Sequence, residues 1–368
     1  MKQARLISGD SHVLEPPQLW LDRVPAKLKG RAPHMISLPQ GDAWIIEGAM
    51  DPIHYGLNQC GGLGPEKRVA WIRWEDARRS GWDPAARVRE IDEDKVDVEI
   101  LYPTPRISIA LYWNNAEAEW NIAMIRAYND WLSEFCSHAP DRFKGLAMIP
   151  TCGLDAATAE MERAMKLPGM AGVTIGRFPN GSLAITPEDD KFWAVAQSLG
   201  ASVNVHVSLA NEPAGEHVRM KVSGEFRFMD APGRALQFIR GGVFDRFPEL
   251  NVVFAEVDAG WVPYVVERLD SMYMRRGPSQ QFAHKRRPKD YFEKNIHWVY
   301  ITDHYGVRNR KEIGVSQLMW SSDFPHSATD WPKSWDTINA DFAGATAEEM
   351  HAVLAGNAAR VYHIGNGG

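Results

Sequence analysis

The sequence is poor in cysteine and has no long apolar run. Its three cysteines, Cys60, Cys136 and Cys152, are scattered without a Cys-x-x-Cys spacing, which gives no disulfide framework and favours a reducing compartment. Neither a signal peptide nor an uninterrupted apolar stretch of 18 residues is present, so secretion and membrane spanning are not expected. We therefore expect a cytoplasmic protein without a membrane partner.

The chain also lacks an excess of positive charge. The net charge is −6, and the basic groups at 275–276 and 285–287 are too short to follow a nucleic-acid groove. They are typical of a solvated loop, so no nucleic-acid partner is expected. What the sequence does contain is 14 tryptophans in 368 residues, which suggests an aromatic-lined pocket or a broad interface.

Eight short apolar runs alternate with helical patterns along the chain. Helical stretches such as 116–138 and 156–167 carry apolar residues at three-to-four spacing between these runs. The pattern predicts an α/β fold of the (β/α)₈ (TIM) barrel class. A doubly wound sheet is the alternative, but its glycine-rich phosphate turn is not matched by Gly9-Asp10-Ser11-His12. The expected strands are 6–10, 96–103, 143–150, 172–176, 202–207, 251–256, 297–302 and 318–323.

One segment interrupts this rhythm. Residues 22–85 are rich in proline, glycine and tryptophan, so we expect an insertion after the first strand, with a small hairpin around DAWIIEG at 42–48. The whole chain, 1–368, is then a single barrel domain.

Polar residues stand at the carboxyl ends of several expected strands. The carboxyl ends of barrel strands meet at one mouth, where barrel enzymes carry their chemistry. Asp10 and His12 are two residues apart in the first strand, so both side chains point to the same face. His206, Glu256 and Asp323 end the fifth, sixth and eighth strands.

Each of these residues has a structural alternative. His206 could be a hydrogen-bonded core residue, and Asp10 and Asp323 could cap a helix or a turn. Together, however, they would bury several charges without a basic partner in the same runs, which is costly. A divalent cation removes that cost, and the mixed nitrogen and oxygen donors suit Zn²⁺, Mn²⁺ or Fe²⁺.

At these same motifs the sequence resembles a known family. The stretches GDSHVLEPPQLW, NVHVS, AEVDAGWVPYVVERLD, MWSSDFPHSATDWP and GNAARVY are similar to the amidohydrolase-related branch of the metal-dependent (β/α)₈ enzymes, which includes aminocarboxymuconate-semialdehyde decarboxylase. The resemblance runs from residue 6 to about 362. It implies that Asp10, His12, His206 and Asp323 are metal ligands, and it favours a homodimer.

The departures from the family pattern concern the reaction. Dinuclear hydrolases of the superfamily carry a carbamylated lysine after the fourth strand, where this chain has Ile175-Gly176-Arg177. Glu256 stands where the branch generally places a histidine. It could act as a general acid/base, bind a second metal, or form a salt bridge with an arginine.

Further candidates surround the expected mouth. Glu15 could bind metal, orient His12 or serve as a helix-entry carboxylate. His326 could be a ligand, a proton donor to substrate or a turn residue. His304 is a candidate for proton transfer. Arg177, Arg106 and Trp331 are candidates for contacting a substrate carboxylate or lining the pocket, with ordinary surface or packing roles as the alternative.

Three functions are compatible with these residues. The main one is a decarboxylase or hydrolase that uses one divalent ion (Zn, Mn or Fe) on a small carboxylic acid or ring-derived substrate. The alternative is a dinuclear iron or manganese oxygenase, because Glu256 and His326 would supply enough ligands for two ions. The third is a metal-poor structural subunit of a hetero-oligomer.

Overall fold

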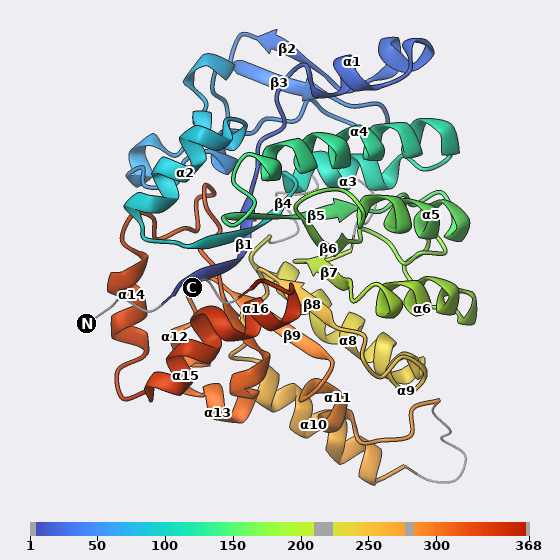
Figure 1. The fold of residues 1–368 in the computed structure, drawn as a ribbon, viewed down its shortest axis with the longest axis vertical. Coiled ribbons are helices and arrows are strands. Elements are labelled where there is room, and N and C mark those ends of the chain that lie inside the picture. Colours follow the sequence, from blue (N-terminus) through green and yellow to red (C-terminus); the bar gives the residue numbers. More distant parts are fainter. Residues whose placement is uncertain (1–4, 210–223, 277–282, 366–368) are drawn as a thin grey trace.

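Eight parallel strands form one sheet that curves into a barrel (Figure 1). This computed structural model describes residues 5–209, 224–276 and 283–365. The strands follow one another in the order β1-β4-β5-β6-β7-β8-β9-β10. All eight overlap the runs expected from the sequence, and the (β/α)₈ class is confirmed. Their bounds are β1 Ile7–His12, β4 Val98–Tyr102, β5 Phe143–Met148, β6 Met170–Thr174, β7 Ser202–His206, β8 Val252–Ala255, β9 Ile296–Tyr300 and β10 Leu318–Trp320.

Helices cover the outside of the barrel, so both faces of the strands are buried. In β4, β8 and β9 every residue is buried, which explains why these strands are mainly apolar instead of alternating with exposed polar residues. Glu99 of β4 and His297 of β9 are the polar exceptions. The helices that follow β4 and the later strands are α3 Pro105–Trp113, α4 Ala118–Ser137, α5 Leu154–Ala164, α6 Asp190–Ser198, α8 Asp230–Arg240, α9 Val243–Arg246, α10 Val262–Met274, α11 Pro288–Phe292, α12 His304–Arg308, α13 Arg310–Ile313, α14 Ser334–Asp341, α15 Ala347–His351 and α16 Asn357–Val361.

The segment between β1 and β4 adds a layer at one side of the barrel. It contains α1 (Leu19–Arg23), the antiparallel pair β2 (His34–Leu38) and β3 (Gly41–Ile45), and α2 (Pro84–Glu93). The hairpin expected around 42–48 is therefore present, and Figure 1 shows it in blue beside α1. The buried Trp20 ring meets Trp44 edge to face at 5.2 Å, and its Nε1 donates to the Met124 carbonyl of α4 at 3.0 Å. Trp20 therefore packs against the hairpin through Trp44 and binds the barrel helix α4 through its indole nitrogen.

The two ends of the strand order, β1 and β10, meet along a seam. Main-chain bonds cross it from His12 N to Phe324 O (2.8 Å) and from Asp323 N to Asp10 O (3.0 Å). Below them, buried serine hydroxyls connect the strands, with Ser11 Oγ 3.1 Å from Ser322 Oγ. Closure at this seam brings the first and last barrel strands together.

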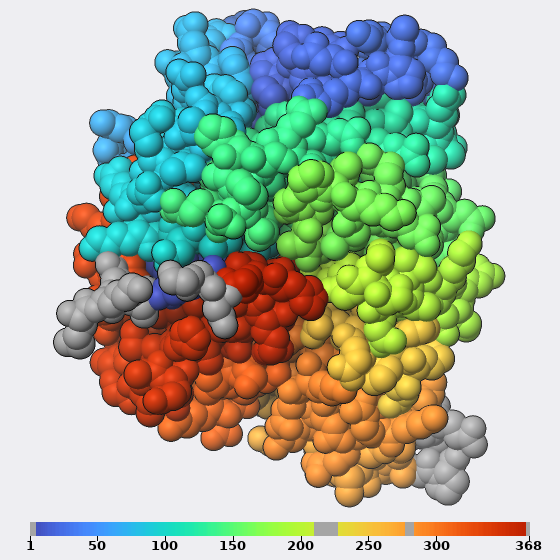
Figure 2. Space-filling model, viewed as in Figure 1, coloured from blue at the N-terminus to red at the C-terminus, as the bar shows by residue number. Residues whose placement is uncertain are grey.

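The C-terminal helices return to the start of the chain. Ala358 and Val361 of α16 and the following Tyr362 pack with Ile7 of β1 and neighbouring strand residues in one buried cluster. Figure 2 shows successive segments as bands from blue to orange, with the red C-terminal segment returning to the middle of this face. Among the described helices, none combines the length and apolar character needed to cross a bilayer.

Candidate metal centre

Asp10 and His12 lie side by side at the end of β1. Both side chains are fully buried, and His12 Nε2 lies 3.3 Å from Asp10 Oδ1. The other ring nitrogen, Nδ1, lies 2.9 Å from the Pro103 carbonyl oxygen. Because a carbonyl only accepts, Nδ1 carries the proton, and the Nε2 lone pair faces the cluster.

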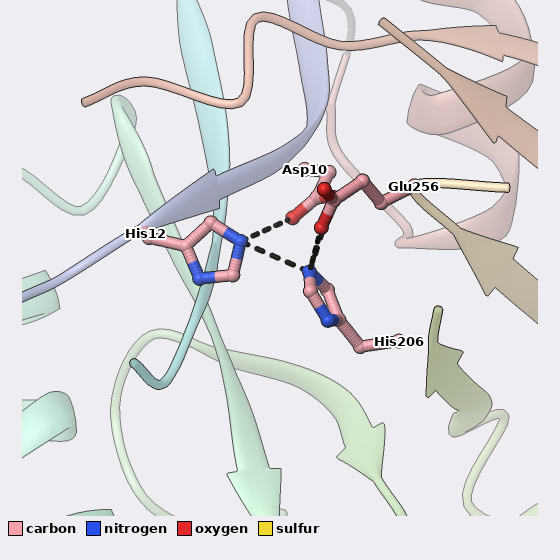
Figure 3. A group of neighbouring side chains, drawn as sticks. All are labelled: Asp10, His12, His206 and Glu256. Carbon is pink, nitrogen blue, oxygen red and sulfur yellow. Dashed lines mark hydrogen bonds and ion pairs between the residues drawn. The ribbon is translucent and has the colours of Figure 1, made fainter. Parts of the chain in front are cut away.

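His206 and Glu256 reach the same point from the ends of β7 and β8. His206 Nε2 lies 3.0 Å from His12 Nε2 and 3.2 Å from Glu256 Oε2. Figure 3 shows Asp10, His12, His206 and Glu256 directed toward one another. Glu256 is the most open of the four, with 30% of its side chain exposed, so it borders the space that a substrate would enter.

Asp323 and His326 complete the cluster from the turn after β10. Asp323 Oδ1 lies 3.4 Å from His12 Nε2 and 2.8 Å from His326 Nδ1. The His326 ring stacks on the His12 ring with centroids 3.9 Å apart. Its Nε2 lies 3.0 Å from the side-chain nitrogen of Asn58, so the segment after β1 also contacts this site.

The donors in this cluster fit a divalent cation. One ligand atom from each of Asp10, His12, His206 and Glu256 lies within 4.8 Å of the others, and a second set combines His12 and Glu256 with Asp323 and His326. The carboxylate oxygens of Asp10 and Asp323 are buried and accept no well-formed hydrogen bond, although imidazole nitrogens of the cluster lie 2.8–3.6 Å from three of them. Orphaned buried carboxylates are costly, and a bound cation with nitrogen and oxygen ligands would satisfy them.

The charges of the cluster perturb one another strongly. Burial and the Asp323 carboxylate raise the pKa of Glu256 to about 8, and burial and Asp10 raise the pKa of Asp323 to about 7. Burial lowers the pKa of His206, but Asp10 and Glu256 overcome it and raise that pKa to about 9. For Asp10 burial acts in the opposite direction and raises the pKa. The His206 and His12 imidazoles outweigh the effect of burial and hold the pKa of Asp10 below its usual range. The cluster thus carries protons that a cation would displace.

The backbone at two of these residues is left-handed. Glu256 has φ 57° and Asp323 has φ 51°, a region that non-glycine residues adopt at a cost of about 1–3 kcal/mol. Glu256 directly follows β8, and Asp323 lies three residues after the end of β10. The sharp turns aim both carboxylates inward, and the surrounding packing must hold that conformation.

A cavity of about 300 Å³ opens over the cluster. Its size suits a small molecule. Gly176 allows the Tyr112 ring to approach, since a Cβ there would come within 2.0 Å of it. Two arginines, Arg106 and Arg227, contribute to the lining. The remaining polar and apolar lining includes Leu57, Asn58, Ser108, Ile109, Tyr112, Thr174, His206, Ser208, Glu256, Asp323 and His326.

The structure brings only some of the predicted site residues to this cavity. Asp10, His12, His206, Glu256, Asp323 and His326 converge, and Arg106 lines the cavity. Glu15 lies outside both sets of ligand atoms. Its Oε1 accepts from Thr104 N at 3.1 Å, its Oε2 is buried without a partner, and burial raises its pKa to about 7.

Arg177, His304 and Trp331 lie outside the cavity lining. The Arg177 guanidinium stacks 4.4 Å from the Trp113 ring centroid and donates to the Gly181 carbonyl. His304 is 60% exposed at the start of α12, with Nδ1 paired to Asp341 at 2.5 Å. The Trp331 ring lies against the Arg78 guanidinium at 4.7 Å, and its Nε1 donates to Glu90 O. Substrate contact or proton transfer by these residues therefore finds no support in the geometry.

Two lining residues were not anticipated. Arg227 lies 21 positions beyond His206 in sequence, and Asn58 lies inside the segment after β1. Neither directly follows a strand, which was the signal used to select mouth residues. A survey of arginines and amides in the long connecting segments would have included both.

Comparison with known proteins agrees with this geometry. The family model described as amidohydrolase matches residues 17–364. A gamma-resorcylate decarboxylase of Rhizobium radiobacter is 27% identical over 266 residues, which cover 66% of this chain and 77% of that protein. Among solved structures, an amidohydrolase from Mycobacterium avium subsp. paratuberculosis K-10 superposes with a TM-score of 0.77 at 19% identity, covering 98% of this chain and 100% of that chain.

A second solved structure contains a metal. Dihydroxybenzoic acid decarboxylase from Polaromonas sp. JS666, with bound manganese and the inhibitor 2-nitroresorcinol, has a TM-score of 0.67 at 19% identity, covering 99% of this chain and 98% of that chain. The predicted family and enzyme class are confirmed, and the oxygenase alternative finds no support among these relatives. The match over nearly the whole sequence shows that this chain belongs to the amidohydrolase family, in which its relatives include decarboxylases.

Proposed function

We propose that this enzyme is a decarboxylase of small aromatic hydroxy acids that depends on one divalent ion. The observation that carries the proposal is a pair of overlapping groups of ligand atoms beside a cavity of about 300 Å³. Asp10, His12, His206 and Glu256 form one group, and His12 and Glu256 join Asp323 and His326 in the other. The activities named for the relatives, on gamma-resorcylate and dihydroxybenzoic acid, favour decarboxylation over hydrolysis.

Four residues would hold the ion. Asp10, His12, His206 and Asp323 supply two imidazole nitrogens and two carboxylates, and both aspartates are fully buried. The bound ion would polarise an oxygen of the substrate. We propose one ion rather than two because His326 Nδ1 is engaged by Asp323 and its Nε2 faces the Asn58 amide. Manganese is the first choice, since it is the metal bound in the Polaromonas enzyme.

Glu256 would move the proton. It borders the cavity, and Asp323 and burial favour its protonated form. Decarboxylation requires a proton on the ring carbon that bears the carboxylate, then cleavage of the bond between these carbons with release of CO₂. Glu256 would deliver that proton and regain one from water. His206 Nε2 lies 3.2 Å from Glu256 Oε2; with the ion bound, that nitrogen would be a ligand and would leave Glu256 free to transfer its proton.

The cavity lining supports an anionic substrate. Arg106 and Arg227 line the same cavity as the carboxylate-rich cluster, so an acid entering the cavity would find two cations in addition to the metal site. Of the two arginines that the sequence suggested for contacting a substrate carboxylate, Arg106 and Arg177, we propose that Arg106 does so.

The organisation of the protein is also a proposal. We propose a single barrel domain over residues 1–368, with residues 22–85 as an insertion that contributes to the cavity through Leu57 and Asn58. A cytoplasmic homodimer remains the expectation from the sequence. Light scattering after size exclusion would measure the mass in solution.

The test begins with metal content and a substrate screen. We expect about one Mn²⁺ or Zn²⁺ per chain, and loss of the absorbance of 2,6-dihydroxybenzoate with stoichiometric release of CO₂. Asp10→Asn should lose both metal and turnover. Two irons per chain with oxygen consumption would instead favour the oxygenase, release of an amine or alcohol would favour a hydrolase, and absence of any metal would favour the structural subunit.

A further inference from the structure

Arg87 is a fully buried arginine outside the cavity lining. It lies on α2 with 0% of its surface exposed. Its Nε and Nη2 donate to the two carboxylate oxygens of Glu99 on β4, at 2.7 and 2.9 Å. Glu99 is equally buried, so this bidentate pair is completely removed from water.

The same guanidinium also binds two main-chain carbonyls. Nη1 donates to His12 O and Nη2 donates to Phe324 O, both at 2.9 Å. The Arg87 Cζ lies 4.6 Å from the Phe324 ring centroid, within range of a cation–π contact. One side chain therefore connects the end of β1, the middle of β4 and the turn after β10.

These carbonyls belong to the residues that present the metal ligands. His12 is itself a ligand of the proposed centre, and Phe324 directly follows Asp323, whose φ of 51° needs support from its surroundings. The Phe324 carbonyl is fixed by two donors, His12 N at 2.8 Å and Arg87 Nη2 at 2.9 Å. Arg87 thus holds the main chain at Phe324, directly after Asp323, and at His12, two residues after Asp10.

Stability alone does not explain such a pair. A buried ion pair pays a large desolvation penalty, and its replacement by apolar residues of similar volume is often neutral or stabilising. What an apolar pair cannot provide is a planar fork that holds two carbonyls at fixed directions.

We propose that Arg87 is a positioning residue that sets the spacing of the metal ligands across the seam between β1 and β10. This inference rests on the proposed metal-dependent function of the same cluster. It predicts that Arg87 governs metal affinity through His12 and Asp323 without touching the metal or the substrate.

The experiment measures Mn²⁺ dissociation constants on metal-free protein by equilibrium dialysis, together with urea denaturation of each metal-free protein. Arg87→Lys keeps the positive charge beside Glu99 but loses the fork to the carbonyls. Arg87→Met combined with Glu99→Met removes both charges at similar volume, and should fold even where the single variant does not. The matched control is Arg310→Lys, because Arg310 also forks onto a carboxylate, Glu349, and donates to the Val307 carbonyl, away from the cavity lining.

We expect both Arg87 variants to bind Mn²⁺ about 10–100-fold more weakly than the wild type, the range found for residues that orient metal ligands. Arg310→Lys should lose a similar amount of stability while its Mn²⁺ affinity stays within twofold of the wild type. Wild-type affinity in a folded Arg87 variant, or an equal loss in the Arg310 control, would overturn the inference. A wild-type protein that binds no divalent ion would instead overturn the proposed function.

Discussion

The protons bound by the metal-free cluster predict how the free energy of unfolding depends on pH. Asp323, Glu256 and His206 have pKa values raised to about 7, 8 and 9 in the folded protein. His12 and His326 are lowered to about 4 and 3, by burial first and then by neighbouring imidazoles. At pH 6.5, the ordinary pKa of histidine, half of these two side chains are still protonated in the unfolded chain, and from about pH 7.5 upward both are essentially neutral in the folded and unfolded chains.

Within the cluster the three raised groups dominate above pH 6.5, and all three act in one direction. The folded metal-free protein binds more protons than the unfolded chain, so its free energy of unfolding must fall as pH rises. Each extra proton corresponds to about 1.4 kcal/mol per pH unit. With between one and two extra protons over pH 6.5–8.5, we expect a loss of about 3–4 kcal/mol.

The Mn²⁺-loaded protein should behave differently. A bound cation displaces the protons of its ligands Asp323 and His206, whereas Glu256 keeps the proton that it would deliver. The free energy of unfolding should therefore fall less steeply over the same range, and the stabilisation by metal should grow with pH. The assay is urea denaturation followed by tryptophan fluorescence at pH 6.5, 7.5 and 8.5, with chelator or with excess Mn²⁺. Groups outside the cluster cancel in the difference between the two series. Parallel curves for the two series would refute the reasoning.

Three further predictions concern single residues. Glu256→Gln should retain Mn²⁺ but lower kcat about 10²–10⁴-fold; near-normal turnover would remove Glu256 from proton transfer. Glu15→Gln should raise the free energy of unfolding by about 1–3 kcal/mol at pH 8 but not at pH 4, because it removes a buried carboxylate whose pKa lies near 7; weaker Mn²⁺ binding instead would make Glu15 a ligand. Arg106→Met should raise KM for an aromatic acid about 10–100-fold, whereas Arg177→Met should leave KM unchanged.

The fold was accessible from the sequence because buried parallel strands have a strong local signature. VDVEILYP and NVVFAE predicted β4 and β8 within a few residues, since strands buried on both faces are mainly apolar. The pairing of Asp10 with His12 followed from the alternation of side chains along a strand. These inferences needed no knowledge of tertiary contacts.

Residues beyond the strand ends were harder to place, because a one-residue offset changes the direction of a side chain. His304 was expected at the mouth, yet its neighbour Asp303 takes the inward position and accepts hydrogen bonds from Ala259 N and Gly260 N at 2.7 Å. His304 is left facing solvent. Asn58 contacts His326 from an irregular segment, and Arg87 of α2 contacts the main chain of His12 and Phe324, so only the folded chain reveals their roles.

The seam between β1 and β10 has a consequence for biosynthesis. Asp10 and His12 leave the ribosome early, whereas Asp323 is separated from them by about 300 residues. A nascent chain therefore carries two of its proposed metal ligands until Asp323 has been made. Since a cross-link over so long a loop removes more entropy from the unfolded chain than one over a short loop, an ion captured across the seam would join the first barrel strand to the last only after every strand between them has been synthesised.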